Sequence, residues 1–268
     1  MASHEDQRDE ALALELVEGG SDLAGAAVGA AIGLLGGPAG ALGGAAAGAV
    51  VGRVVRRVGA DLKQRILGPR EELRVGAATA FAGAAIQALL EDGQQPRDDG
   101  FFDSTENQRP AAEELFEGVL LQARDAYEEK KVRLLGVMYA QFAFRTDITP
   151  ARANHLLSLA SQLTYRQLIV LAIACDQNER QRLRDGNYRG DAAALDEIGP
   201  EGVALLIEIY DLYQRGLLSD AEASAWISVA DVNPQGTRLQ GSGAALADFM
   251  GLNTIPATDR EPIYAMLA

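Results

Sequence analysis

Residues 23–52 read LAGAAVGAAIGLLGGPAGALGGAAAGAVVG. This Gly/Ala tract holds 30 consecutive uncharged residues, of which ten are Gly, eleven Ala, one Pro and eight bulky aliphatic residues. Its glycines recur at every fourth position in two registers, which are Gly25, Gly29, Gly33 and Gly37, then Gly36, Gly40, Gly44, Gly48 and Gly52. Residues four apart lie on one face of a helix, and a face without side chains lets two helices approach closely. The tract therefore predicts a glycine zipper that packs helices or subunits together.

The two registers meet at Gly36, Gly37 and Pro38. Proline cannot continue the first helix because it lacks an N–H group, and glycine readily adopts the positive φ of a turn. We therefore predict two helices, over residues 22–35 and 39–58, that are joined in a tight hairpin.

The length of this hairpin bears on whether it enters a bilayer. Each arm of about 14 residues would span only ~21 Å, which is short of the ~30 Å hydrocarbon core. As one segment the tract is long enough, and its eight bulky aliphatic residues favour insertion by about −2 to −5 kcal/mol. Two interpretations stay open. The tract enters a membrane conditionally, as an oligomer, or it forms a soluble hairpin buried as a close-packed core.

Charge is unevenly distributed along the 268 residues, whose formal net charge is −14. Residues 53–76 carry a net charge of +4, whereas the rest of the chain is acidic. A basic segment that directly follows an apolar tract is typical of contact with anionic headgroups, so we expect Arg53, Arg56 and Arg57 to contact anionic lipid or a partner. The alternative is a solvated amphipathic helix. The acidic N-terminus lacks the basic region of a secretory signal, which favours a cytoplasmic protein peripherally associated with the inner membrane.

The remaining sequence predicts a predominantly helical, all-α fold. We expect an N-terminal region over residues 1–93, with an Ala-rich helix at 70–90, and an exposed linker at 94–109. A core domain at 110–195 would hold helices at 131–144 and 150–162, followed by a helix that opens on the capping box at 164–167. In residues 196–268, the order of the predicted helices and strands resembles that of a winged-helix module. Pro200 begins a helix, a strand at 226–232 forms a β-hairpin with residues 238–239, and a helix covers residues 244–250.

The sequence lacks the standard motifs of catalytic and phosphate-binding sites. It contains no phosphate-binding loop, no His-Glu-x-x-His and no Gly-x-Ser-x-Gly, so we expect no enzyme activity, no catalytic residue, no cofactor and no metal. The single Cys175 lies in an apolar run, which predicts a buried and inert thiol. Four acidic residues could form a turn that holds Ca²⁺, but they lack the EF-hand spacing, so we expect a solvated turn; they are Asp98, Asp99, Asp103 and Glu106. Two pairs of adjacent carboxylates are expected to face solvent, and they are Glu113 with Glu114 and Glu128 with Glu129. The excess of acidic residues at 196–268 argues against nucleic acid as a partner.

Several short segments resemble recurrent signatures of uncharacterised bacterial helical proteins. These are RDDGFF at residues 97–102, EEKK at 128–131, LGVMYA at 135–140, and residues 153–163 leading into LTYRQL at 163–168. The resemblance covers about residues 70–170 and implies a helical fold and a bacterial, intracellular origin, with no catalytic residue. Separately, the glycine zipper is similar to those of bacterial membrane-associated and pore-forming proteins, some of which act as toxins or immunity effectors.

Together these features predict a non-enzymatic, membrane-associated effector or anchor. Its glycine zipper would drive homo-oligomerisation or conditional insertion into inner-membrane lipid, and its helical domain would bind a protein partner. The alternative is a soluble helical scaffold or protein-interaction module whose Gly/Ala hairpin is only a tightly packed core.

Overall fold

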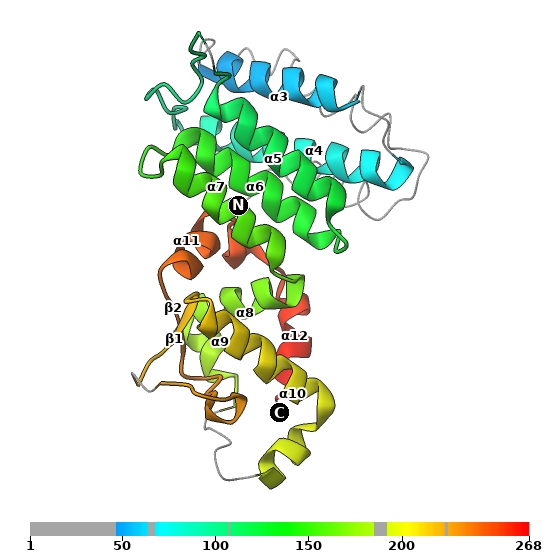
Figure 1. Ribbon diagram of the computed structural model, residues 1–268, viewed down its shortest axis with the longest axis vertical. Coiled ribbons are helices and arrows are strands. Elements are labelled where there is room, and N and C mark those ends of the chain that lie inside the picture. Colours follow the sequence, from blue (N-terminus) through cyan, green and yellow to red (C-terminus); the bar gives the residue numbers. More distant parts are fainter. Residues whose placement is uncertain (1–46, 64–67, 107, 185–191, 223–224, 268) are drawn as a thin grey trace. The chain divides into compact units, whose positions relative to one another are not determined.

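The computed structural model describes residues 47–63, 68–106, 108–184, 192–222 and 225–267 (Figure 1). In these residues the chain is predominantly helical, with one small two-stranded antiparallel sheet. The predicted all-α class is therefore confirmed. The chain divides into two compact units, Met1–Gln162 and Leu163–Ala268, here called the first and the second unit.

The described part of the first unit consists of five helices. They are α3 (Ala47–Lys63), α4 (Pro69–Glu91), α5 (Ala111–Asp125), α6 (Lys130–Phe144) and α7 (Pro150–Gln162). Two of these helix starts are set by local sequence: Pro69 and Pro150 have the φ that a first helical residue needs, and the Glu71 carboxylate accepts a 2.8 Å hydrogen bond from the Gly68 N–H at the start of α4. The helices predicted at 70–90, 131–144 and 150–162 are confirmed.

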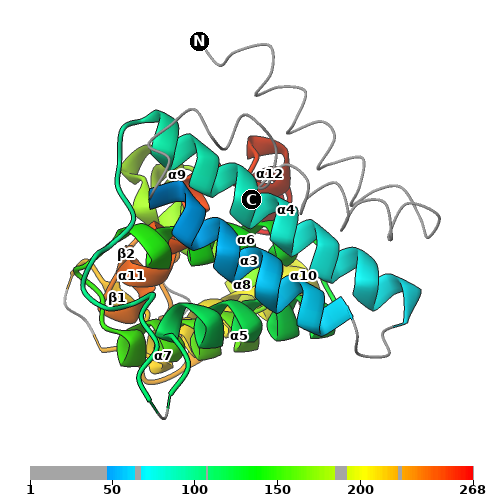
Figure 2. The same ribbon diagram turned by 90° about the horizontal axis from the view of Figure 1, so that it is seen from above.

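The core of the first unit forms where α4 lies along α6, with α5 against both helices. α3 packs on α5 and α4, and Figure 2 shows α3 and α4 beside each other. Fully buried aromatic side chains fill the centre, and the Phe116 and Tyr139 rings have centroids 4.4 Å apart.

The segment predicted as a linker, residues 94–109, lies inside the first unit instead of between two domains. Most of it is exposed, but the Arg97 side chain is only 2% exposed and donates a hydrogen bond to the Phe142 carbonyl. Phe101 is buried beneath the Arg97 guanidinium, which lies 4.6 Å from the centre of its ring. These two side chains anchor the segment to α6, and its polar composition gave no sign of that.

The second unit is built around α8 (Tyr165–Cys175), which α10 (Ala192–Gln214), α11 (Ser242–Phe249) and α12 (Ala257–Met266) contact. Shorter elements complete it, and they are α9 (Gln177–Gln181), β1 (Leu218–Asp220), the 3-10 turn η2 (Val229–Asp231), β2 (Thr237–Leu239) and the 3-10 turn η3 (Leu252–Thr254). The predicted capping box is confirmed, because the Thr164 hydroxyl accepts from the Gln167 N–H and the Gln167 side chain accepts from the Thr164 N–H. The predicted division at residue 195 therefore falls within this unit, whose central helix begins at Tyr165.

The strand predicted at residues 226–232 is wrong. β2 pairs with β1, in the register Leu218 with Leu239, and residues 226–232 form a loop around η2. The Asp231 carboxylate explains this difference, because it accepts hydrogen bonds from the N–H groups of Ile227 and Ser228 and so bends the chain out of a strand. The helix start predicted at Pro200 agrees with the structure, because Gly199 (φ 69°) breaks the regular geometry of α10 just before it; at the other end of α10, Gly216 (φ 67°) follows Gln214 by two residues.

Candidate functional site

The residues that the sequence selects fall into two groups. The first group lies on α3 and consists of Gly48, Gly52, Arg53, Arg56 and Arg57, although the side chain of Arg56 lies outside the described part of the structure. The others lie outside the described residues, namely Gly25, Gly29, Gly33, Gly36, Gly37, Pro38, Gly40 and Gly44. α3 is therefore the described end of the predicted zipper, and its contact with the first unit is the candidate site.

α3 is amphipathic, and its apolar face is covered. Its buried valines are 0–5% exposed, and they are Val51, Val54, Val55 and Val58. Gly52 and Gly59 are buried beside them, while Arg53 and Arg57 are exposed. Burial of four valines favours docking by several kcal/mol, at about 25 cal/mol per Å² of apolar surface. The described end of the zipper thus packs within its own first unit.

One ion pair joins α3 to α5. Arg57 Nη1 lies 3.1 Å from Glu113 Oε1, with side-chain exposures of 70% and 9%. The sequence predicted a solvated Glu113, and this prediction is wrong. Glu113 lies three residues before buried Phe116, on the flank of the apolar stripe of α5, and this spacing could have indicated its burial. Removal of Arg57 would leave a largely buried carboxylate without this cation, which is costly.

Tyr139 of α6 lies near this pair. Its ring is fully buried, and its hydroxyl has no hydrogen-bond partner among the described residues. Burial raises the pKa of the Tyr139 phenol, and the nearby Glu113 carboxylate raises it further. An unpaired buried hydroxyl costs about 1–3 kcal/mol, so Tyr139 stabilises this unit less than a hydrogen-bonded tyrosine would.

The second small-residue helix, α4, packs against α6 by close backbone approach. A Cβ added at Gly136 of α6 would lie 2.7 Å from the Ala78 carbonyl oxygen and 2.9 Å from the Ala82 nitrogen of α4. Within the described residues, one helix is long and apolar enough to cross a membrane, namely Arg70–Glu91, with a mean hydropathy of 1.4. Because 56% of that span is buried in the protein, it also meets the description of a core helix.

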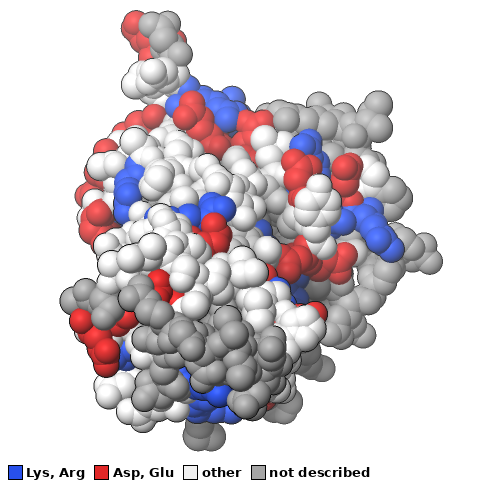
Figure 3. All heavy atoms as spheres, turned by 60° about the horizontal axis from the view of Figure 1, so that its bottom comes forward, with Lys and Arg blue, Asp and Glu red and all other residues white. Residues whose placement is uncertain are grey.

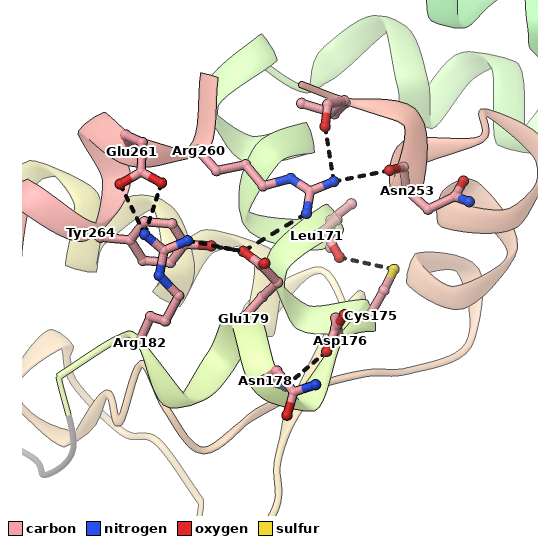
Figure 4. A network of polar contacts seen from close by, with 11 residues as sticks. Leu171, Cys175, Asp176, Asn178, Glu179, Arg182, Asn253, Arg260, Glu261 and Tyr264 are labelled. Atoms are coloured by element: carbon pink, nitrogen blue, oxygen red, sulfur yellow. Dashed lines mark hydrogen bonds and ion pairs between the residues drawn. The ribbon is translucent and has the colours of Figure 1, made fainter. Parts of the chain in front are cut away.

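Cys175 is exposed, so the prediction of a core thiol is wrong. It is the last residue of α8, where it donates to the Leu171 carbonyl at 3.3 Å, and partial desolvation raises the pKa of its thiol (Figure 4). A shallow cavity of about 330 Å³ adjoins it and is lined by Cys175, Leu239, Ala244, Ala247, Asp248 and Asn253. A raised thiol pKa disfavours the nucleophilic thiolate.

Other polar clusters have structural partners. Figure 4 shows Arg260 donating to the carbonyls of Asn253 and Ile255, and the Tyr264 hydroxyl donating to Glu179, which ties α12 to α9 and η3. In the acidic turn, the Arg97 guanidinium holds the Asp99 carboxylate and lowers its pKa. No group of three or more His, Cys, Asp or Glu among the described residues is arranged to hold a metal ion.

Figure 3 shows how charged side chains are distributed on one face of the protein. On the face drawn in Figure 3, Lys and Arg side chains adjoin Asp and Glu side chains across a largely uncharged surface. Comparison of the chain with protein-family models, with curated proteins and with solved structures finds no match. The function is therefore inferred from the geometry of α3 and from the tract that precedes it.

Proposed function

We propose that this chain is a non-enzymatic bacterial membrane-associated effector or anchor, whose Gly/Ala tract is held against the first unit at rest. Release of the tract lets its glycine faces pair between subunits, or enter the inner membrane. The observation that carries this proposal is the docking of α3, which buries its valines and leaves Arg53 and Arg57 exposed.

The docking geometry supports a reversible contact. α3 is fastened by an apolar face and by the Arg57–Glu113 pair, and one partner of that pair is 70% exposed. Arg53 is exposed, and Arg57 is 70% exposed at the edge of the contact with α5, so a membrane surface can attract both arginines while the valines stay docked. Once α3 detaches, the same amphipathic helix has the apolar face and cationic face of an interfacial helix.

The competing function is a soluble helical scaffold. Two observations favour it: Gly52 is buried within the first unit, and Gly136 already brings α4 and α6 into close backbone contact. In a scaffold the small residues serve only to pack helices, and a larger side chain in the tract would unfold the protein. In an effector, Gly40→Leu or Gly44→Leu would abolish membrane binding while the second unit stays folded.

Flotation with vesicles of phosphatidylethanolamine and phosphatidylglycerol tests the proposal. Arg57→Glu places a second negative charge beside Glu113 and should release α3, so a larger fraction of the protein floats than for the wild type. Arg53→Glu is the matched control, because it makes the same charge change on the exposed side of α3 without altering the 3.1 Å pair.

Hydrogen exchange of the α3 amides reports release independently of vesicles. Faster exchange in Arg57→Glu together with increased flotation supports the effector, and Gly40→Leu in that background should return the protein to the soluble fraction. Faster exchange without any flotation would contradict the effector function and would support the soluble scaffold.

A further inference from the structure

One ionised side chain of α5 fastens α3 to the first unit. The Glu113 side chain is 9% exposed, and its carboxylate accepts a hydrogen bond from Arg57 Nη1 at 3.1 Å. The Arg57 side chain is 70% exposed, so water can solvate its guanidinium whether α3 is docked or released. The surroundings of the Glu113 carboxylate therefore decide much of the free energy that release of α3 costs.

A second hydrogen-bond donor lies close to this carboxylate. Tyr139 of α6 is fully buried, and its ring packs on Phe116 with centroids 4.4 Å apart. Phe116 lies one turn after Glu113 on the same side of α5, and the Glu113 charge acts on the Tyr139 phenol. The Tyr139 hydroxyl nevertheless has no hydrogen-bond partner among the described residues. Two donors thus lie near one acceptor, and the docked structure pairs that acceptor with Arg57.

Tyrosine is an unfavourable choice at position 139 for a side chain that serves only as core. Phenylalanine would keep the ring contact with Phe116 and would avoid the cost of burying a hydroxyl without a partner. Buried polar groups of folded proteins are nearly always hydrogen-bonded, so an exception needs a reason. A partner that Arg57 occupies in one state and leaves free in another state gives such a reason.

We propose that Arg57 and Tyr139 compete for the Glu113 carboxylate, and that the Tyr139 hydroxyl is a positioning group that favours release of α3. While α3 is docked, Arg57 holds the carboxylate. When α3 detaches, Arg57 leaves with it, and the Glu113 side chain turns and accepts a hydrogen bond from the Tyr139 hydroxyl. The phenol keeps its proton throughout, because burial raises its pKa.

The new hydrogen bond lowers the cost of release, so the docked and released states lie closer in free energy. This inference rests on the proposed release of α3 and adds the groups that set its equilibrium. It concerns the docking of α3 alone, so its tests need no lipid. A failure of vesicle flotation would contradict the membrane function and leave these tests unchanged.

The first test is a double-mutant cycle on the full-length protein, read by hydrogen exchange of the α3 amides. Tyr139→Phe should slow this exchange about fivefold, because the docked state loses an unpaired hydroxyl and the released state loses a hydrogen bond. In the Glu113→Ala background, the same change should alter the rate less than about twofold. Tyr165→Phe is the matched control, because it removes a hydroxyl that donates to Asp259 in the second unit, and it should leave α3 exchange unchanged.

The second test is a reversal of sign, read by exchange of the α6 amides, which reports opening of the core of the first unit. In the wild-type background, Tyr139→Phe should slow α6 exchange, because it removes a buried hydroxyl without a partner. Arg57→Ala frees the Glu113 carboxylate while the valines of α3 stay docked. In that background the hydroxyl has a partner in the folded protein, so Tyr139→Phe should speed α6 exchange.

Three results would overturn the inference. If Tyr139→Phe slows α3 exchange equally with and without the Glu113 carboxylate, the hydroxyl acts without Glu113. If Tyr139→Phe speeds exchange in the wild-type background, the hydroxyl is already paired while α3 is docked, for example with a buried water. If Tyr139→Phe slows α6 exchange in the Arg57→Ala background as well, Arg57 and Tyr139 do not compete for one acceptor.

Discussion

The contact between α4 and α6 in the first unit and the packing around α8 in the second unit bury apolar surface in different ways. In the first unit, α4 and α6 come together because side chains are small or missing, and Gly136 lies against the backbone of Ala78 and Ala82. In the second unit, α8 is surrounded through bulk, with buried Leu168, Leu171 and Ile173. An added methyl group would clash in the contact between α4 and α6, whereas a shortened side chain would leave a cavity around α8. Small residues therefore fix the distance between helices, whereas large ones supply most of the apolar area.

Removal of bulk from α8 should have the largest effect. Leu168 is 0% exposed, so Leu168→Ala should lower the free energy of unfolding by about 2–5 kcal/mol through lost burial and a cavity. Urea unfolding followed by Trp226 fluorescence measures it in the second unit. Leu239→Ala, at a half-buried position of β2 in the same unit, is the control and should cost less. A loss below about 1 kcal/mol for Leu168→Ala would contradict the comparison.

Addition of a single methyl group tests the first unit. Gly136→Ala places a Cβ against backbone atoms, which cannot rotate away, and should cost about 1–3 kcal/mol. In Gly118→Ala the new Cβ meets the Leu157 Cδ2 atom at 2.9 Å, and that side-chain end can move. Both changes gain about the same helix propensity. The difference between their unfolding free energies therefore measures the cost of the clash between the new Cβ of residue 136 and the α4 backbone. Equal values for the two variants would refute it.

Loss of the α8 cap should have a moderate effect. The Thr164 hydroxyl accepts a 3.1 Å hydrogen bond from the Gln167 N–H. Thr164→Ala should therefore cost about 1 kcal/mol, within the 0.5–2 kcal/mol that such caps contribute. Thr146→Ala, at an exposed residue before α7, serves as the control in the same denaturant series.

The smallest effect concerns pH in the first unit. Hydrogen bonds from Arg97 lower the pKa of Asp99 below its usual value of 3.8, so this carboxylate stabilises the fold above that pH. The contribution should disappear as the pH falls through the lowered pKa, because protonated Asp99 no longer pairs with the buried Arg97. Thermal unfolding between about pH 5 and pH 2 should show a shallower acid slope for Asp99→Asn than for Asp98→Asn. Identical slopes would show that the Asp99 carboxylate does not contribute to the loss of stability in acid.

Local signals in the sequence predicted the helices, because caps and breakers act within a few residues. Thr164 with Gln167, Pro200 and Gly216 all mark observed boundaries. The failures involve partners distant in sequence. Glu113 is buried because Arg57 lies across from it, and this pairing could not be known before α3 was placed on α5.

The alternating apolar residues at 226–232 predict a strand, but hydrogen bonds to the Asp231 carboxylate shape this segment into a loop. Cys175 ends a buried helix but lies exposed, because position within an apolar run does not fix which side of its last turn is covered. For the candidate site, the sequence selected α3 and its arginines but not Glu113, and most of the zipper lies outside the described residues.

Fractionation of cells that express the full-length chain tests the central claim most directly. The washed membrane pellet is extracted with carbonate, and a chain without residues 22–46, which keeps α3 intact, is the control. The account predicts that part of the full-length protein stays in the carbonate-resistant pellet and that the shortened chain is soluble. If both proteins are soluble and the full-length protein is compact and monomeric, the Gly/Ala tract is internal packing, and the membrane function is contradicted.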